Sequence, residues 1–279
     1  MVDESTSHGE RVAFQGEPGA YSEMATMQYF RSSNLLPLKS LQEVFDALRN
    51  GVADFGVVPI ENSIEGSVNE TYDLLLGTDS VVSGEIYQRV RHCLIVNKGE
   101  GSNIKSVYSH PQALAQCRRY LQERKLTAIA AYDTAGAVKM IKQKKDMQAA
   151  AIASRRAAEL YNMDILEEGI EDSKNNFTRF LIISKATTKS TGHDGTSMIF
   201  SVKHIPGALY SILEEFANRK INLTKIESRP TKEKPWEYNF YVDFEGHISD
   251  KIIKEAVESV KKKAAFIKIL GSYKRAEFP

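Results

Sequence analysis

Residues 54–63, DFGVVPIENS, join an almost unbroken apolar run to three consecutive polar side chains. The apolar part, Asp54–Ile60, predicts a strand that is buried on both faces, which is typical of strands in parallel sheets. Glu61, Asn62 and Ser63 follow at the carboxyl end of this strand, where sheets of this kind bind their ligands. The stretch therefore predicts a mostly parallel α/β sheet with polar groups presented to a cleft. The start of a helix, capped by asparagine or serine, is the alternative for the polar residues.

Short apolar runs alternate with helical patterns around this stretch, which predicts mostly parallel sheets with helices on both faces. The pattern restarts after a long extended segment, Val81–Val96. Two such α/β series predict two lobes with hinges near 81–96 and 176–186, and the cleft between two lobes suits a small molecule. Strands are expected at Val12–Phe14, Leu35–Leu38, Asp54–Ile60, Ser106–Ser109, Thr127–Tyr132, Ala149–Ala153 and Phe180–Ser184. Helices are expected to open at Gly19–Ser22 and to cover Ser40–Arg49, Pro111–Glu123, Thr134–Lys142 and Ser154–Tyr161.

The pattern changes after a polar, glycine-containing segment, 187–195, which is typical of a linker between domains. Residues 196–279 carry strands and helices in the order βαββαβ, which predicts a ferredoxin-like module. The two helices of such a module cover one face of its sheet, so the other face or an edge is expected to be free for a partner. The predicted organisation is a flexible tail, 1–10, a two-lobed domain, 11–186, the linker and this module.

The charge and cysteine content exclude several classes of protein. The 279-residue chain has 37 Lys and Arg against 36 Asp and Glu, a net charge of +1, which gives no basic excess for nucleic acid. Cys93 and Cys117 lie far apart and form no CxxC pair, so a reducing compartment is expected. No apolar run approaches the roughly 18 residues of a membrane span, and the first ten residues lack the apolar core of a secretion signal. We therefore expect a cytoplasmic protein that binds neither nucleic acid nor membrane.

Cofactor motifs are missing from the sequence. It contains no GxGxxG, Walker or GxSxG motif. Its six histidines are scattered and show no spacing typical of metal ligands. No nicotinamide, nucleotide or metal is therefore expected, and no cofactor is assigned.

Further polar groups follow other predicted strands. Phe14–Glu23 combines glycines with a helix N-terminus, which favours an anion, although an ordinary Gly-Pro turn has the same pattern. His110 and Ser154 each follow a strand and begin a helix, and for His110 a capping role is the stronger expectation. Asn175–Phe180 places a hydroxyl beside Arg179, whose guanidinium can bind a carboxylate through two hydrogen bonds. A turn with a solvated arginine is the alternative there.

Four segments, in this order and spacing, resemble the prephenate dehydratase family, whose pattern the arogenate dehydratases share: Gly16–Ala25, Pro59–Val68, His110–Cys117 and Asn176–Phe180. In the C-terminal module, Gly207–Leu209 and Asn222–Pro230 resemble the ACT regulatory domain of the same family. The resemblance covers nearly the whole chain after the tail.

The resemblance implies a two-lobed catalytic domain like a type II periplasmic binding protein, followed by an ACT domain. It implies conversion of prephenate to phenylpyruvate, water and carbon dioxide in L-phenylalanine biosynthesis. L-Phenylalanine is expected to be an allosteric inhibitor. Because paired ACT domains create effector sites at their interface, a homodimer or homotetramer is also expected.

The essential hydroxyl of the family corresponds to Thr178. Because a threonine hydroxyl is a very weak acid, Thr178 is expected to stabilise the departing oxygen, with Glu61 as a candidate source of the proton. A positioned proton donor typically contributes about 10²- to 10⁴-fold to rate. The expected catalytic residues are Thr178, Glu61 and Arg179, and the expected substrate contacts are Ser22, Asn62, Ser63, Ser154, Asn176 and Phe180. The expected effector contacts are Gly207, Ala208, Leu209, Asn222, Leu223, Glu227 and Ser228.

Two alternatives stay open. The chain has Ala20-Tyr21 where many bacterial members have Thr-Phe, and this variation leaves both prephenate and arogenate possible as substrates. A non-enzymatic sensor would bind such anions without consuming them, although Thr178 beside Arg179 favours an enzyme. A DNA-bound regulator is disfavoured, because no helix-turn-helix segment precedes the lobes and the net charge is only +1.

Overall fold

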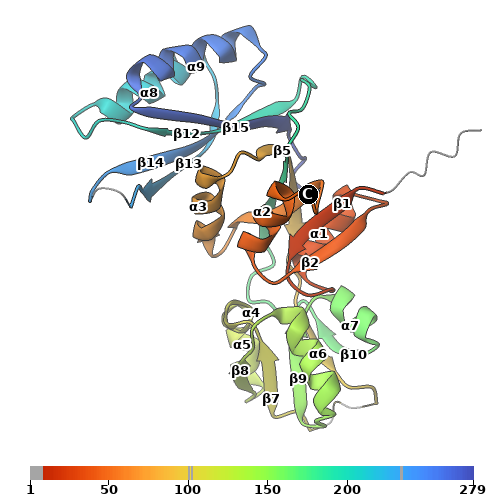
Figure 1. Ribbon diagram of the computed structural model, residues 1–279. Helices are drawn as coiled ribbons and strands as arrows, with labels where there is room; N and C mark the ends of the chain where they lie inside the picture. The colour runs from red at the N-terminus through yellow and green to blue at the C-terminus, as the bar shows by residue number, and fades with distance from the viewer. Residues whose placement is uncertain (1–8, 100, 102, 233–234) are drawn as a thin grey trace, which may run out of the picture. The chain divides into compact units, whose positions relative to one another are not determined.

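The computed structural model describes residues 9–99, 101, 103–232 and 235–279 (Figure 1). The expected tail, 1–10, therefore lies almost entirely outside the described residues. The chain divides into two compact units. The first contains the chain up to Val68 together with Tyr87–Phe180, and the second contains Asn69–Ile86 together with Leu181–Pro279.

The first lobe is built on one sheet, and its elements are β1 (Arg11–Gln15), α1 (Tyr21–Tyr29), β2 (Asn34–Leu38), α2 (Leu41–Arg49), β3 (Phe55–Asn62), β4 (Gly66–Ser67), β5 (Val81–Arg89) and β11 (Phe177–Ser184). The strand order is β2-β1-β3-β11-β5, with β4 paired to β3. β1 pairs in parallel with β2 and β3, so that Val12 lies opposite both Leu35 and Phe55. Residues 12–14 are fully buried, as expected for a central strand covered on both faces.

The second lobe has a five-stranded sheet, and its elements are β6 (Cys93–Val96), β7 (Ser106–Ser109), α4 (Pro111–Gln116), α5 (Arg118–Glu123), β8 (Thr127–Ala130), α6 (Thr134–Lys144), β9 (Ala149–Ala153), α7 (Arg155–Tyr161) and β10 (Asp164–Glu168). The strand order is β10-β6-β9-β7-β8. Alternate residues of β9 enter two cores: Ala151 packs with α6 and α7, whereas Ile152 packs with α4 and α5. Helices therefore cover both faces of this sheet, as the sequence predicts (Figure 1).

Three details of this lobe differ from the expectation. The helix expected over Pro111–Glu123 is broken at Cys117, because the carbonyl of Gln116 accepts its hydrogen bond from the N–H of Asp172 instead of continuing the helix. The strand expected to reach Tyr132 ends at Ala130. Strand β10, which the sequence did not indicate, pairs antiparallel with β6, and β6 pairs antiparallel with β9, so this sheet is mixed and not mostly parallel as expected.

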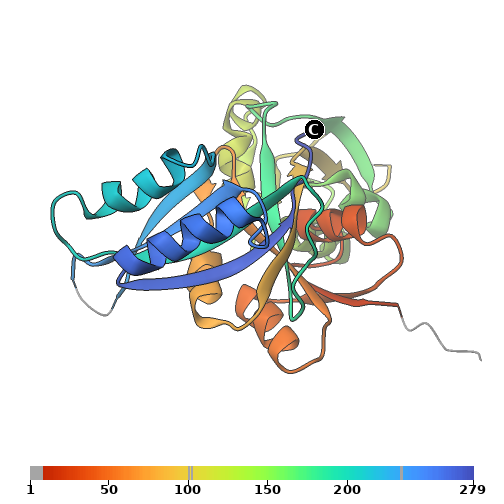
Figure 2. The same ribbon diagram turned by 90° about the horizontal axis from the view of Figure 1, so that it is seen from above.

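The C-terminal module has the predicted βαββαβ order, and its elements are β12 (Asp194–Ser201), α8 (Ala208–Ala217), β13 (Leu223–Pro230), β14 (Tyr238–Glu245), α9 (Lys251–Lys263) and β15 (Phe266–Lys274). Its antiparallel sheet has the order β13-β14-β12-β15. Both helices lie on one face (Figure 2), where Phe200, Phe216 and Phe244 pack in a common core. The cross-strand alternation of this sheet explains that core.

The opposite face of this sheet is covered by α3 (Asn69–Gly77), which belongs to the same compact unit. Tyr72 of α3 packs against Tyr241 with ring centroids 4.8 Å apart, and the Tyr241 hydroxyl donates to the Tyr72 carbonyl at 2.9 Å. Lys268 donates to the carbonyls of Leu75 and Leu76 at the end of α3. The expectation of a free sheet face is therefore wrong over this area, because the helix that covers it was not predicted from the sequence.

The segment expected to be a linker, 187–195, ends inside regular structure. Asp194 is the first residue of β12, and its carboxylate accepts hydrogen bonds from the N–H groups of Thr191 (2.8 Å) and Gly192 (3.0 Å). The segment that leads into the module is thus a fixed turn.

Within the described part of the chain, no helix is both long and apolar enough to span a membrane.

Candidate active site

Asn62, the last residue of β3, is fixed by the turn that follows it. Its Oδ1 accepts hydrogen bonds from the backbone N–H groups of Ile64 and Glu65, both at 3.0 Å. This geometry is a turn and not the helix start considered as an alternative. Because a backbone N–H can only donate, the two bonds determine which end of the amide is the oxygen. The Nδ2 group of Asn62 therefore points toward β11.

Three acceptors at the start of β11 surround this Nδ2 group. It lies 2.8 Å from Oδ1 of Asn176, 3.1 Å from the carbonyl oxygen of Phe177 and 3.0 Å from Oγ1 of Thr178. Asn176 is fully buried. β11 begins three residues earlier than expected, so Thr178 is held in a strand and not in a turn. The fold thus brings together three of the residues singled out in the sequence: Asn62, Asn176 and Thr178.

Gln116, which the sequence reasoning did not single out, completes this cluster. Its Oε1 accepts from Nδ2 of Asn176 at 2.8 Å, and its Nε2 lies 3.3 Å from a carboxylate oxygen of Glu65. A signal was present, since Gln116 lies in the segment His110–Cys117 that carries the family resemblance. A glutamine in a predicted helix is ordinarily a surface residue, however, and nothing in its periodicity distinguishes it. We refer to Gln116, Asn176 and Asn62 as the amide chain.

The hydroxyl of Thr178 is oriented by the amide chain. Its oxygen accepts the hydrogen bond from Asn62, which leaves its own proton for another acceptor. Among the described residues, none accepts that proton from Thr178, and the side chain is half-buried. The arrangement therefore presents a hydroxyl donor beside the carboxyl end of β3, where a ligand oxygen could accept it.

Ser63 and Ser22, two of the expected substrate contacts, form hydrogen bonds with backbone groups of nearby loops. The Ser63 hydroxyl donates to the carbonyl of Asn175 at 2.9 Å and accepts from the N–H of Phe177 at the same distance. The Ser22 hydroxyl donates to the carbonyl of Gln15 at 2.5 Å and does not cap α1. Both side chains therefore fix the backbone of the segments in which the sequence placed a ligand site.

Ser154 joins the two lobes. Its hydroxyl donates to the carbonyl of Gly19 at 2.6 Å and accepts from the N–H of Ala157 at 3.0 Å, so it caps α7. A Cβ on Gly19 would lie 2.8 Å from the Cα of Ala157, so only glycine allows this approach.

The expected capping role of His110 is confirmed, since its ring accepts from the N–H of Gln112 at 3.3 Å.

Glu61 and Arg179 are the other two residues expected to be catalytic, and both are half-buried. Each is adjacent in sequence to a member of the cluster: Glu61 precedes Asn62 in β3, and Arg179 follows Thr178 in β11. Phe180 is buried, with 3% of its surface exposed.

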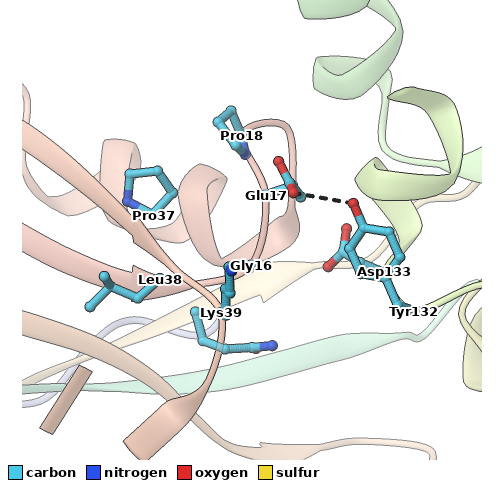
Figure 3. Close-up of a pocket in the computed structure, with 9 residues that line it drawn as sticks. Gly16, Glu17, Pro18, Pro37, Leu38, Lys39, Tyr132 and Asp133 are labelled. Carbon is cyan, nitrogen blue, oxygen red and sulfur yellow. Dashed lines mark hydrogen bonds between the residues drawn. The ribbon is translucent and has the colours of Figure 1, made fainter. Parts of the chain in front are cut away.

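A cavity of about 450 Å³ lies beside the loop that follows β1 (Figure 3). Residues of both lobes line it: Gln15, Gly16, Glu17, Pro18, Pro37, Leu38, Lys39, Tyr132 and Asp133. Glu17 spans the lobes, since its carboxylate accepts from the Tyr132 hydroxyl at 3.1 Å and from Lys139 at 3.0 Å. Gly136 makes this possible, because a Cβ there would lie 2.3 Å from the Tyr132 ring. Burial raises the pKa of Asp133, which caps α6.

The thiols of the first unit are not suited to nucleophilic chemistry. Both cysteines are free and buried. Burial raises the pKa of Cys93 to about 11, and burial also raises the pKa of Cys117. Since the thiolate is the reactive form, neither sulfur is an available nucleophile at neutral pH.

Over the described residues, no group of three or more His, Cys, Asp or Glu side chains is arranged to hold a metal ion.

Comparison with known families identifies this arrangement. The family model described as "Prephenate dehydratase" matches residues 12–188, which is more than half of the chain. The chain belongs to the prephenate dehydratase family. The family model described as "ACT domain" matches residues 196–262, so this prephenate dehydratase family member carries the regulatory module that its sequence resembles. The expected fold class and family are thereby confirmed.

Two curated relatives illustrate the similarity. The chain is 44% identical over 265 residues to the prephenate dehydratase of Methanocaldococcus jannaschii, which covers 91% of this chain and 94% of that protein. It is 40% identical over 287 residues to arogenate dehydratase/prephenate dehydratase 2 of Arabidopsis thaliana, which covers 98% of this chain and 75% of that protein. The relatives of this prephenate dehydratase family member thus include proteins named for each of the two substrates.

Two solved structures share the complete fold. The prephenate dehydratase of Arthrobacter aurescens in complex with L-Phe is 32% identical, covers 95% of this chain and 90% of its own, and superposes with a TM-score of 0.88. GqqA, described as a novel type of quorum quenching acylase, is 33% identical, covers 96% of this chain and 99% of its own, and has a TM-score of 0.89. The prephenate dehydratase fold alone therefore does not fix the reaction, and the site residues must carry the assignment.

The residues expected to bind an effector lie at two places in the ACT domain. Gly207 precedes α8 with φ = 79°, a left-handed conformation that favours glycine, and Ala208 and Leu209 form the first turn. Leu223, Glu227 and Ser228 belong to β13, an edge strand of the sheet, and Asn222 directly precedes it. Gly207, Asn222 and Ser228 are exposed, whereas the other four are half-buried.

Proposed function

We propose that this chain is a prephenate dehydratase that uses Thr178 at the leaving hydroxyl of its substrate. The observation that carries the proposal is the Asn62–Thr178 hydrogen bond of 3.0 Å, in which the threonine oxygen is the acceptor, so that its own proton is left for the substrate. Membership of the prephenate dehydratase family supports the same reaction. The catalytic domain is proposed to comprise residues 11–186 and the regulatory domain residues 196–279, joined by 187–195.

The reaction breaks two bonds of the prephenate ring. The bond from the ring carbon to its carboxylate breaks, and its electron pair enters the ring as carbon dioxide leaves. The bond from the opposite ring carbon to its hydroxyl breaks, and the departing oxygen takes up a proton to leave as water. Formation of the aromatic ring supplies the driving force. The protein must therefore stabilise a poor leaving group, which a positioned donor can accelerate by about 10²- to 10⁴-fold.

The proposed roles follow from this division of the reaction. Thr178 donates a hydrogen bond to the departing oxygen, and Glu61 is the proposed source of the proton. Arg179 is proposed to bind a carboxylate through its guanidinium, whose paired donors match that group. Ser22, Asn62, Ser63, Ser154 and Asn176 are proposed to line or shape the substrate site, in which Phe180 provides an apolar surface. A dry environment around the ring carboxylate would favour its loss.

The ACT domain is proposed to bind L-phenylalanine and to inhibit turnover. The Arthrobacter aurescens relative, whose structure contains L-Phe, supports this choice of effector. The proposed contacts are Gly207, Ala208, Leu209, Asn222, Leu223, Glu227 and Ser228. L-Phenylalanine can shift the population of conformations only by its differential affinity for them. We further propose a homodimer or homotetramer, and a cytoplasmic location, which the two free cysteines support.

Turnover of the purified protein on prephenate, followed through phenylpyruvate, tests both halves of the proposal. We expect turnover that L-phenylalanine suppresses. Turnover of arogenate in preference to prephenate would reassign the substrate, and the Arabidopsis relative named for both activities makes this the second candidate. Binding of prephenate without turnover of either compound would contradict the enzymatic assignment and favour a sensor.

A further inference from the structure

His92 connects Gln116, at one end of the amide chain, to Tyr21 of the first lobe. It lies between β5 and β6, where the chain crosses from the first sheet to the second, and only 2% of its surface is exposed. Its Nε2 lies 3.0 Å from Oε1 of Gln116, and its Nδ1 lies 3.1 Å from the hydroxyl oxygen of Tyr21. Its backbone N–H donates to the carboxylate of Glu171 at 2.9 Å. The ring is therefore held at both of its nitrogens, and the backbone of His92 is held at a third point.

The polarity of the amide chain determines what this ring must do. Backbone donors make Oδ1 of Asn62 an acceptor, so its Nδ2 faces Oδ1 of Asn176. Nδ2 of Asn176 then faces Oε1 of Gln116, which makes that oxygen an acceptor as well. The nitrogen of His92 that faces the same oxygen must therefore carry a hydrogen. Each orientation follows from the previous one, starting from backbone groups whose polarity is fixed.

We propose that His92 is a positioning residue for the dehydration: its Nε2–H group holds Gln116 and, through Asn176 and Asn62, orients the hydroxyl of Thr178. This inference rests on the proposed function, because it concerns the residue placed at the leaving group. His92 touches neither the substrate nor the departing oxygen in this scheme. Its effect on the reaction is transmitted through three neutral side chains.

The surroundings of the ring are compatible with the tautomer that this role requires. Burial lowers the pKa of His92, although the Gln116 hydrogen bond and the Glu171 charge oppose that effect. The imidazole is therefore neutral at neutral pH and carries a single N–H. The Tyr21 hydroxyl lies within hydrogen-bond distance of Nδ1 and also 2.8 Å from the carbonyl of Arg91, so its one proton can serve either acceptor. Nδ1 can thus remain unprotonated, with the hydrogen on Nε2.

Two substitutions separate the donor from the volume of the side chain. His92→Leu keeps a side chain of similar size but removes the N–H donor. We expect kcat on prephenate to fall about tenfold, with a smaller change in KM. His92→Gln can place an amide N–H near the position of Nε2, and we expect kcat within about threefold of the unaltered protein. His247→Leu is the matched control, since His247 is also buried but bonds Ser249 and Thr188. It should leave kcat unchanged.

A spectroscopic measurement on the unaltered protein tests the chain independently of activity. ¹⁵N NMR of protein with labelled histidine should show His92 as the neutral tautomer with hydrogen on Nε2 at pH 7. The opposite tautomer would overturn the inference, and so would a His92→Leu variant with kcat within twofold of the unaltered protein. Equal kcat values for His92→Gln and His92→Leu would overturn it as well. If the leucine variant does not fold, the glutamine variant and the tautomer decide. Absence of prephenate turnover in the unaltered protein would instead contradict the proposed function, and the tautomer would still be measurable.

Discussion

The amide chain of the first unit and the α3 contact of the second unit hold their neighbours by opposite means. Gln116, Asn176 and Asn62 are neutral, largely buried and joined by short bonds whose polarity is fixed from end to end. Around α3, the carboxylate of Asp73 is paired with Arg229 at 3.4 Å and with Lys232 at 2.6 Å. Neutral amides have directional bonds and no net charge, whereas an ion pair tolerates movement and weakens in salt. The difference suggests that the first unit requires one geometry, whereas the second can adjust.

The largest effect is expected from Thr178→Ala. This change removes the hydroxyl proposed to stabilise the leaving group, and we expect kcat on prephenate to fall by about 10²-fold or more. The thermal midpoint should change little, because no described residue depends on a proton from Thr178. Thr178→Ser is the matched control and should retain most of the activity. Near-normal turnover in the alanine variant would remove Thr178 from the mechanism.

Asn62→Asp tests whether the amide chain depends on polarity rather than on shape. The new carboxylate would keep one oxygen for Ile64 and Glu65 but would place the other against Oδ1 of Asn176 and the carbonyl oxygen of Phe177, neither of which can donate. We expect the free energy of unfolding to fall by about 2 kcal/mol or more, since these two buried acceptors lose their donor. Urea unfolding at pH 7 measures this loss. An unchanged midpoint would mean that the chain can reverse its hydrogen bonds.

Asp194→Asn provides a pH-dependent case in the second unit. Burial opposes ionisation, but hydrogen bonds from Thr191, Gly192 and Ser190 hold the pKa of Asp194 below its usual value. A lowered pKa contributes stability above the unfolded pKa of about 3.9, and this contribution is lost as the pH falls through the folded pKa. We expect the variant to be about 1 kcal/mol less stable at pH 7. The difference should shrink below about pH 4 in urea titrations, and a difference independent of pH would contradict the carboxylate's role.

Asp73→Asn is the reverse of the Asn62 substitution and should have the smallest effect. It removes two ion pairs that are partly exposed, and such pairs contribute about 0.2–1 kcal/mol. The loss should diminish further in 1 M salt, because exposed charges are screened. Urea unfolding at low and high salt gives both values, and basal turnover should be unchanged. A loss as large as that of Asn62→Asp would erase the contrast between the two contacts.

The sequence predicted the parts of the site that follow strands. Asn62, Asn176 and Thr178 are polar residues next to apolar runs, and such a pattern is visible without a structure. Gln116 was missed because its partners are 60 residues distant in Asn176 and 51 residues distant in Glu65, and helical periodicity carries no information about them. The break at Cys117 was missed for the same reason, since the carbonyl of Gln116 is bonded to Asp172.

The fold was predicted well where hydrophobic periodicity is strong and poorly where elements are short. The two lobes and the βαββαβ module follow from regular alternation, but α3 has only nine residues and no clear apolar stripe. Missing α3 led to the expectation that one sheet face of the module was free. Tyr241 and Lys268 contact this helix, and neither contact could be inferred from spacing because they join residues more than 160 positions apart.

The position of α3 bears on any exchange of regulatory domains. α3 begins at Asn69, two residues after β4 of the first unit, yet Tyr72 and Leu75 are buried in the second unit, with 3% and 1% of their surfaces exposed. A chimera joined at the linker, 187–195, would leave this helix behind with its apolar residues uncovered. A foreign ACT domain would also need counterparts of Tyr241 and Lys268 on its sheet. The unit that can be exchanged is therefore discontinuous in sequence, and it includes the helix as well as the module.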